Sequence, residues 1–212
     1  MSIKVKSLAV GSIQTNCFII WEEESKEGVV IDPGGNPHEI IKLIDDNQLD
    51  IKWVLLTHGH FDHTFYAKDI ANHSNCKIAM SKDDLEILES SLLISSDFDY
   101  DISKHIQFTP DRFLLDGDVL EIGKSKIQVV YTPGHSPGCI CFITEIGVFV
   151  GDTIFANSIG RTDFPGGNFE KIVNSIKTRI LTMQDDIKLY PGHGPSTTVD
   201  RERTYNPFLQ YI

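Results

Sequence analysis

Four side chains of the kind that bind metals stand within six residues of this sequence. An apolar, β-branched run typical of a buried strand leads directly into HGHFDH, residues 58–63. Imidazole nitrogens and carboxylate oxygens are ligands that zinc and similar cations accept. In an extended turn His58 and His60 project to the same side, and coiling after them would bring Asp62 and His63 to an adjacent position. The hexapeptide therefore predicts two ligands for each of two neighbouring metals.

Three later apolar runs also end in a glycine that is followed by a ligand-type residue. These residues are His135, Asp152 and His193, and the two oxygens of Asp152 could bridge a metal pair. Seven ligands leave room for a shared water, which a catalytic site needs and a closed structural site lacks. Two metals about 3.5–4 Å apart hold a hydroxide at neutral pH and polarise a carbonyl together. The set therefore predicts a two-metal catalytic centre.

Apolar runs with strand character fall into two groups, one in each half of the chain. Strands are predicted at 3–10, 16–21, 28–31, 53–57 and 77–80, and again at 119–122, 127–132, 139–144, 148–151 and 187–190. Helices with one apolar face are predicted behind each group of strands. This order suits two sheets packed face to face and covered by helices on their outer faces.

Three polar residues are placed to begin the predicted helices, namely Asn36, Ser81 and Asn168. Glu39 could close a capping box with Asn36, and Phe169 opens the apolar stripe of the helix behind Asn168. Residues 94–110 show no clear period, so we expect a surface excursion there.

Charge and composition exclude several partners. The chain of 212 residues suits one domain, and its formal net charge of -11 argues against nucleic acid, whose phosphates favour basic surfaces. No stretch reaches the roughly eighteen apolar residues that span a bilayer, and the first residues lack the apolar core of a secretory signal. We therefore expect a cytoplasmic monomer or small homo-oligomer that acts on a small molecule and contacts no membrane.

The remaining histidines and the cysteines have simpler interpretations. His38, His73 and His105 are interpreted as solvated residues of helices or loops. The four cysteines form no CxxC pair, and in a cytoplasmic chain we expect buried, reduced thiols.

Residues 57–63 resemble the THxHxDH motif of the metallo-β-lactamase superfamily, and the glycine-ligand pairs at His135, Asp152 and His193 match its later motifs in order. The resemblance covers nearly the whole chain. It implies an α+β fold, the αββα four-layer sandwich, in one domain over residues 1–212. It also implies two divalent metals, with zinc as the expected metal and iron or manganese as alternatives. Asp32 resembles an early Asp-x-Gly element that supports the site from behind its ligands; its other interpretation is a plain turn after a strand.

Within that superfamily, residues 151–155 and 158–163 resemble the glyoxalase II group, and residues 14–17 and 206–208 its short bacterial members. This resemblance implies hydrolysis of S-acyl glutathione thioesters such as S-lactoylglutathione by attack of a metal-bridging hydroxide. Asp62 and Asp152 are the predicted catalytic residues, because Asp62 would orient the nucleophile and Asp152 would bridge the metals. The sequence stops at Ile212, so the C-terminal helical extension of full-length glyoxalase II is expected to be absent.

By position Arg161 matches a lysine that the family places after its Gly-Asp motif, so the resemblance implies a substrate-binding role for Arg161, whose guanidinium can bind a carboxylate. Its other interpretation is an ion pair with Asp163 or another acidic neighbour.

Two further activities fit the same fold. Residues 160–164 and 138–139 resemble persulfide dioxygenases, which use a single iron. A lactonase or β-lactamase that opens cyclic esters or amides is the second alternative. A binding module without catalysis would need a broken ligand set, whereas all seven positions are filled here.

Overall fold

The first sheet is built from residues 3–113, within a computed structural model that describes residues 2–210. Its strands, in spatial order, are β1 (Ile3–Val10), β2 (Thr15–Glu22), β3 (Glu27–Ile31), β4 (Asp50–Leu55), β5 (Lys77–Met80) and β6 (Arg112–Phe113). β1, β2 and β3 pair antiparallel, whereas β3 to β6 pair parallel. Parallel neighbours need long crossover connections, which is why helices accompany this part of the sheet.

The second sheet is built from residues 119–198. Its spatial order is β14 (Thr197–Thr198), β13 (Lys188–Pro191), β10 (Gly147–Gly151), β9 (Ile140–Thr144), β8 (Ser125–Tyr131) and β7 (Val119–Ile122). β7 to β10 form an antiparallel meander, β10 pairs parallel with β13, and β14 pairs antiparallel with β13. A small ribbon of β11 (Ile154–Phe155) and β12 (Ser158–Ile159) follows β10.

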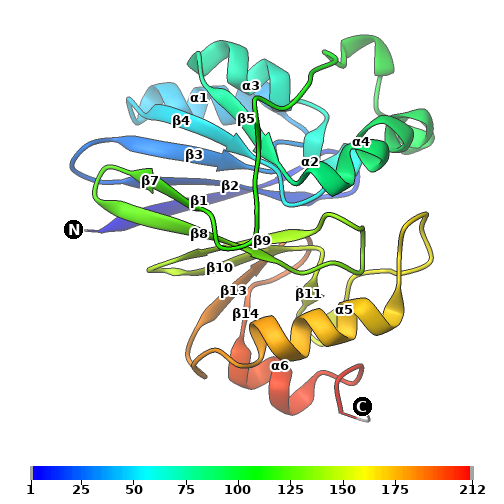
Figure 1. Ribbon diagram of the computed structural model, residues 1–212. Coiled ribbons are helices and arrows are strands. Elements are labelled where there is room, and N and C mark those ends of the chain that lie inside the picture. The colour runs from blue at the N-terminus through cyan, green and yellow to red at the C-terminus, as the bar shows by residue number, and fades with distance from the viewer. Residues whose placement is uncertain (1, 211–212) are drawn as a thin grey trace.

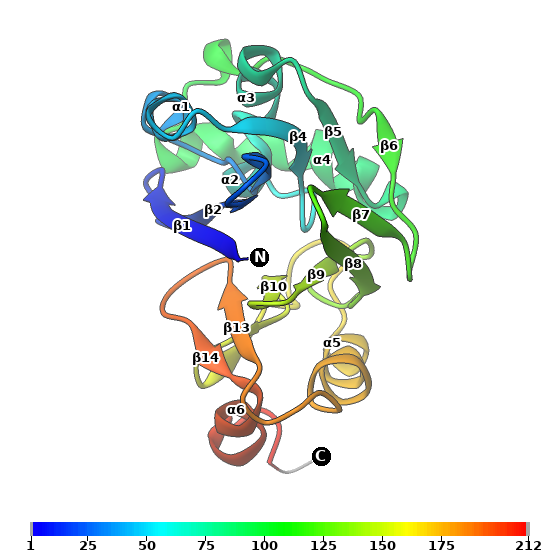
Figure 2. The same ribbon diagram turned by 90° about the vertical axis from the view of Figure 1, so that its left-hand side faces the viewer.

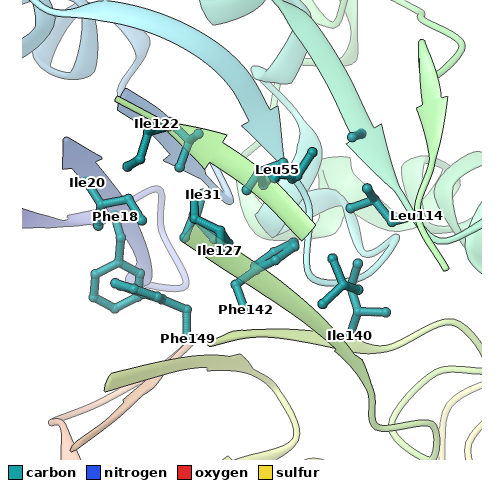
Figure 3. Packing of buried hydrophobic residues seen from close by; sticks show 14 of the residues in the cluster. Phe18, Ile20, Ile31, Leu55, Leu114, Ile122, Ile127, Ile140, Phe142 and Phe149 are labelled. Atoms are coloured by element: carbon teal, nitrogen blue, oxygen red, sulfur yellow. The ribbon is translucent and has the colours of Figure 1, made fainter. Parts of the chain in front are cut away.

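The inner faces of the two sheets pack on each other and form the central core (Figure 3). Phe18 and Ile31 of the first sheet face Phe142 and Phe149 of the second, and all four side chains are buried. The rings of Phe18 and Phe149 meet edge to face with centroids 5.0 Å apart. Contacts of this kind add to the burial of apolar area and fix how the two sheets sit on each other.

Helices cover the outer face of each sheet (Figures 1 and 2). The first sheet carries α1 (Pro37–Asp46) and α3 (Ala67–Ser74), and the second carries α5 (Phe169–Ser175) and α6 (Val199–Tyr205). Apolar stripes hold them there, with Ile40 and Ile70 buried on the first sheet and Ile172 on the second. The predicted α+β class and αββα four-layer sandwich are confirmed.

The connection between β5 and β6 is a series of short helical turns. It contains η1 (Lys82–Asp84), α4 (Leu85–Ser91), η2 (Leu92–Phe98) and η3 (Ile102–Lys104). Residues 94–110, predicted as a surface excursion, are mostly exposed, but Tyr100 is buried. Its ring packs edge to face on Phe61 of α2 (Phe61–Thr64) and on Phe65. The excursion is therefore anchored beside the hexapeptide.

Asn36 and Asn168 precede their helices as predicted, but the capping box of Asn36 and the burial of Phe169 were wrong. Asn36 adopts a left-handed conformation with φ 49°, and its side chain makes no capping hydrogen bond to α1. It accepts from the Gly11 N–H (2.9 Å) and donates to the Glu39 carboxylate (2.9 Å), so a tertiary contact replaces the capping box. Asn168 does cap α5, but Phe169 is 47% exposed because the buried stripe begins at Ile172. The helix continues as a π-helical turn, η4 (Ile176–Ile180).

Within residues 2–210, no helix is both long enough and apolar enough to cross a membrane.

Candidate metal centre

Parallel strand pairing gathers the candidate residues at one edge of the sandwich. β3 and β4 are parallel neighbours, so Asp32 and the hexapeptide at 58–63 leave the first sheet at the same edge. β10 and β13 are also parallel, which places Asp152 beside His193. An isolated bridge between Thr15 and His193 joins the two sheets at this edge. Residues far apart in the sequence therefore meet here.

All seven candidate ligands lie in one cluster. Their ligand atoms form three overlapping groups, each with its atoms within 4.8 Å of one another: His58, His60 and His135; His58, His63 and Asp152; Asp62, His63 and His193. Asp152 lies between the others, because its Oδ1 is 3.5 Å from His63 Nε2 and its Oδ2 is 3.6 Å from Nε2 of both His135 and His193. This arrangement suits a dinuclear metal site.

Ring nitrogens that face away from the cluster have fixed partners. His63 Nδ1 lies 2.9 Å from the Asp32 carboxylate, and His135 Nδ1 lies 2.8 Å from the Arg161 carbonyl oxygen. Partners of this kind set the tautomer and the orientation of a metal-binding imidazole. They leave Nε2 of both rings directed at the cluster.

Three buried atoms of the cluster have no hydrogen-bond partner among residues 2–210. They are His58 Nε2, His63 Nε2 and Asp152 Oδ1. Buried polar atoms are nearly always paired in folded proteins, because an unpaired one costs about 1–3 kcal/mol. The three residues concerned form one of the groups able to hold a metal. Divalent cations coordinated by this cluster would satisfy all three atoms, so the site fits the metals that the donor set implies.

The electrostatics of the histidines also fit cation binding. Burial lowers the pKa of His58 well below its ordinary value and that of His60 to about 4, and neighbouring histidines add to both shifts. Both rings are therefore neutral and available as ligands. Burial would also lower the pKa of His63, but three neighbouring carboxylates outweigh burial and raise this pKa to about 10. They belong to Asp62, Asp152 and Asp32. His63 thus carries a proton that a bound metal would displace.

Asp62 is held in its charged form. Burial alone would raise its pKa, but the neighbouring His63 and His193 and a hydrogen bond from Thr15 outweigh burial and lower it. The Thr15 hydroxyl donates to Asp62 Oδ2 at 2.8 Å, and His193 Nε2 lies 3.2 Å from the same oxygen. In the sequence Thr15 stands only within the run 14–17 that resembles short bacterial glyoxalase II members, and nothing in that run indicates its contact with Asp62.

Asp84 is a second residue whose place at the site was missed. Its buried carboxylate accepts from the Gly59 N–H (2.7 Å), the Ser136 hydroxyl (2.6 Å) and the Gly138 N–H (2.6 Å). These contacts tie the hexapeptide loop to the loop that carries His135. In the sequence Asp84 marks only the start of a helix, and no local pattern reveals partners that lie 25 to 54 residues away.

A cavity of about 460 Å³ opens over the cluster, and Arg161 is one of its lining residues. The Arg161 guanidinium donates to both oxygens of Asp163, from Nε at 2.9 Å and from Nη2 at 2.7 Å. It also lies 4.2 Å from the centroid of the Phe164 ring. The ion pair with Asp163 is therefore present, and Arg161 stands where a substrate in the cavity could reach it.

The other histidines lie away from the cluster. His38 is exposed, His73 pairs with Asp45 at 2.9 Å, and His105 Nδ1 lies 2.9 Å from the Phe65 carbonyl oxygen. All four cysteines carry free thiols, as predicted, with three buried and Cys76 only partly so.

Comparison with known proteins gives concordant matches over nearly the full chain. A family model described as the Metallo-beta-lactamase superfamily matches residues 10–196. Hydroxyacylglutathione hydrolase GloC of Haemophilus influenzae is 37% identical over 210 residues, covering 98% of each chain. The crystal structure of BLEG-1 B3 metallo-beta-lactamase superposes with a TM-score of 0.88 at 32% identity, covering 98% of this chain and 100% of that one. The crystal structure of TTHA1623 in a di-iron-bound form has a TM-score of 0.85 at 32% identity, with 96% and 100% covered.

Proposed function

The chain belongs to the metallo-β-lactamase superfamily, and we propose from this premise that it is a dinuclear metallo-hydrolase that cleaves S-acyl glutathione thioesters. The observation that carries the proposal is the convergence of seven ligand-type side chains in one cluster beside a cavity. Three of the seven have buried unpartnered atoms, and five of the seven line the cavity. The relative named hydroxyacylglutathione hydrolase, which aligns along the whole site region, supports glutathione thioesters as the substrate class. The predicted cytoplasmic location and single-domain organisation stay predictions.

The residues divide naturally between two cations. His58, His60 and His135, which form one group of neighbouring ligand atoms, would hold the first, and Asp62, His63 and His193, which form another, would hold the second. Asp152, with one oxygen near His63 and the other near His135 and His193, would contact both. When bound, such cations lower the pKa of water and polarise a carbonyl oxygen. Zinc is the metal we propose, and the di-iron form of TTHA1623 keeps iron as an alternative.

The chain's own residues position the reacting groups. The ionised carboxylate of Asp62 can accept a hydrogen bond from the attacking water and orient it towards the thioester carbonyl. In the net reaction, water adds to the carbonyl carbon, the C–S bond breaks, and the thiol leaves with a proton. Arg161, with N–H groups beyond the two given to Asp163, would contact a carboxylate of the glutathione carrier.

Elemental analysis of the purified protein, combined with an S-lactoylglutathione assay, tests the proposal. We expect about two metal ions per chain and thioester hydrolysis that tracks metal content. Oxygen uptake with glutathione persulfide is the matching assay for the single-iron dioxygenase. A protein that holds one iron and consumes oxygen, without hydrolysing the thioester, would refute the proposal.

Hydrolysis of a cyclic amide is the second candidate, because the similar BLEG-1 structure is named as a B3 metallo-β-lactamase. The same pair of cations could polarise a strained amide carbonyl. Parallel assays with a chromogenic β-lactam, a lactone and S-lactoylglutathione rank the three substrate classes by kcat/KM.

A further inference from the structure

The walls of the cavity over the cluster are apolar. Its floor carries His60, Asp62, Asp152 and His193, whereas the walls include Ile13, Ile87, Ile94, Phe98, Phe155 and Phe164. These side chains come from four separate parts of the chain, the 11–14 turn, the α4–η2 segment, β11 and the loop after β12. Ile94 and Phe98 are each 43% exposed, so apolar surface remains open to whatever enters.

The polar side chains of the cavity wall already form hydrogen bonds or ion pairs within the protein. The Ser91 hydroxyl donates to the Gly59 carbonyl oxygen at 3.1 Å, and the Ser90 hydroxyl to the Ile87 carbonyl oxygen at 3.5 Å. Arg161 is the one lysine or arginine among the lining residues of the described chain, and its guanidinium is paired with Asp163. A small hydroxylated acyl group would therefore find few partners outside the metal cluster.

We infer that this cavity binds the acyl chain of the thioester and that the preferred acyl group is apolar and longer than lactoyl. The inference rests on the proposed function. It places the acyl end of the substrate inside the cavity and the carrier end outside it. The thioester carbonyl lies over the floor formed by Asp62, Asp152 and the histidines. The acyl chain lies against Ile87, Ile94 and Phe98, and the charged carrier extends outward past Arg161.

The burial of apolar area predicts how strongly binding should depend on the length of the acyl chain. Each methylene that leaves water for an apolar wall changes binding by up to about fourfold, the equivalent of about 0.8 kcal/mol. Chain length should therefore control kcat/KM until the cavity is full. A hydroxyl on the acyl group should weaken binding, because the apolar wall offers no hydrogen bond in place of the water that the hydroxyl loses.

The test is a series of glutathione thioesters with one carrier and different acyl groups. With the metal-loaded enzyme we expect kcat/KM to rise at least about tenfold from S-acetyl- to S-hexanoylglutathione, and S-hexanoyl- to exceed S-lactoylglutathione. If kcat/KM does not change with acyl length, or if S-lactoylglutathione is the best substrate, the inference is overturned while the proposed function is retained.

A matched pair of variants checks that the effect arises in this cavity. Ile94 lines the cavity, whereas its neighbour Leu93 is 79% exposed and does not. Ile94→Ser should reduce the ratio of hexanoyl to acetyl kcat/KM by about threefold or more, while Leu93→Ser should leave the ratio unchanged. Equal effects of the two substitutions contradict the assignment.

Binding of uncleavable analogues separates the two hypotheses. By calorimetry on the metal-loaded protein, S-hexylglutathione should bind at least about tenfold more tightly than S-methylglutathione. Equal affinities overturn the inference whether or not thioesters are cleaved. If the affinity difference holds but no thioester is hydrolysed, the apolar site is supported and the proposed function fails.

Discussion

The carboxylate of Asp32 lies 2.9 Å from Nδ1 of His63, and both side chains are almost completely buried. Asp32 also accepts from the Thr57 N–H (2.8 Å) and the Thr57 hydroxyl (2.7 Å). Its backbone has φ 53°, a left-handed conformation that Asp and Asn tolerate better than most residues. The carboxylate is therefore fixed from the first sheet, and in turn it fixes the ring of His63.

Asp32→Asn should weaken metal binding by about 10–100-fold, the effect usual for a partner behind a metal-binding histidine. The amide preserves the shape and the backbone conformation but removes the charge that orients His63. Competition with a metal-binding dye measures the affinity. Asp45→Asn is the matched control, because it alters an exposed carboxylate–histidine pair with His73. Equal metal affinity of Asp32→Asn and wild type would show that the contact does not support the site.

His58→Ala and Asp152→Ala should nearly abolish hydrolysis while the fold largely survives. His58→Ala removes a ligand of the first cation, and Asp152→Ala removes the carboxylate that would contact both, so each variant leaves at least one cation short of a ligand. Thioester hydrolysis measures the loss, and circular dichroism confirms that the fold is retained. The control is His38→Ala, an exposed helix residue. Wild-type turnover in either site variant would falsify the proposed centre.

The fold and the ligand cluster followed from the sequence for a specific reason. Strand ends were recognisable from apolar runs that stop at or near glycine, and Asp152 and His193 follow the ends of the parallel neighbours β10 and β13 within two residues. Once parallel strands pair, their ends must meet at one edge. Local pattern and topology therefore point to the same residues.

Tertiary contacts account for what the sequence did not reveal. Asp84 and Thr15 act through partners distant in the chain, and neither lies in a pattern that indicates such partners. Asn36 stands in a sequence typical of a capping box, yet its side-chain oxygen accepts a hydrogen bond from the N–H of Gly11, 25 residues earlier. Phe169 fits the helical spacing of the apolar stripe, yet its side chain is exposed and burial begins only at Ile172.

Gly151→Ala should destabilise the protein more than Gly117→Ala. Both positions have positive φ, +49° and +86°, so both substitutions carry the strain of about 1–2 kcal/mol that a left-handed alanine brings. A Cβ at Gly151 would also lie 2.6 Å from Thr57 Cβ, whereas Gly117 has open space. Overpacking adds about 1–3 kcal/mol. Urea denaturation of both variants gives the comparison, and equal losses would contradict it.

Native thiols should react slowly with alkylating agents. Burial raises the pKa of Cys76 and of Cys141 to about 11, and those of Cys17 and Cys139 also lie well above the ordinary value. The thiolate is the reactive form, so little of it exists at neutral pH. Mass spectrometry after iodoacetamide treatment should find most chains unmodified, with partly exposed Cys76 labelled first. In denaturant all four should react, and rapid labelling of Cys139 in native protein would contradict the buried placement.

Metal removal should lower the melting temperature. A ligand that binds only the folded state stabilises it by about 4 kcal/mol when its free concentration exceeds Kd a thousandfold, which corresponds to about 8–16 °C for a chain of this size. Chelation should also destabilise the fold because it leaves the buried polar atoms of His58, His63 and Asp152 without a partner. Calorimetry before and after strong chelation measures the shift, and zinc, iron or manganese should restore it. His58→Ala serves as the control, because a variant with a broken ligand set should gain less from added metal. If wild-type protein melts at the same temperature with and without metal, these buried atoms are not satisfied by a cation.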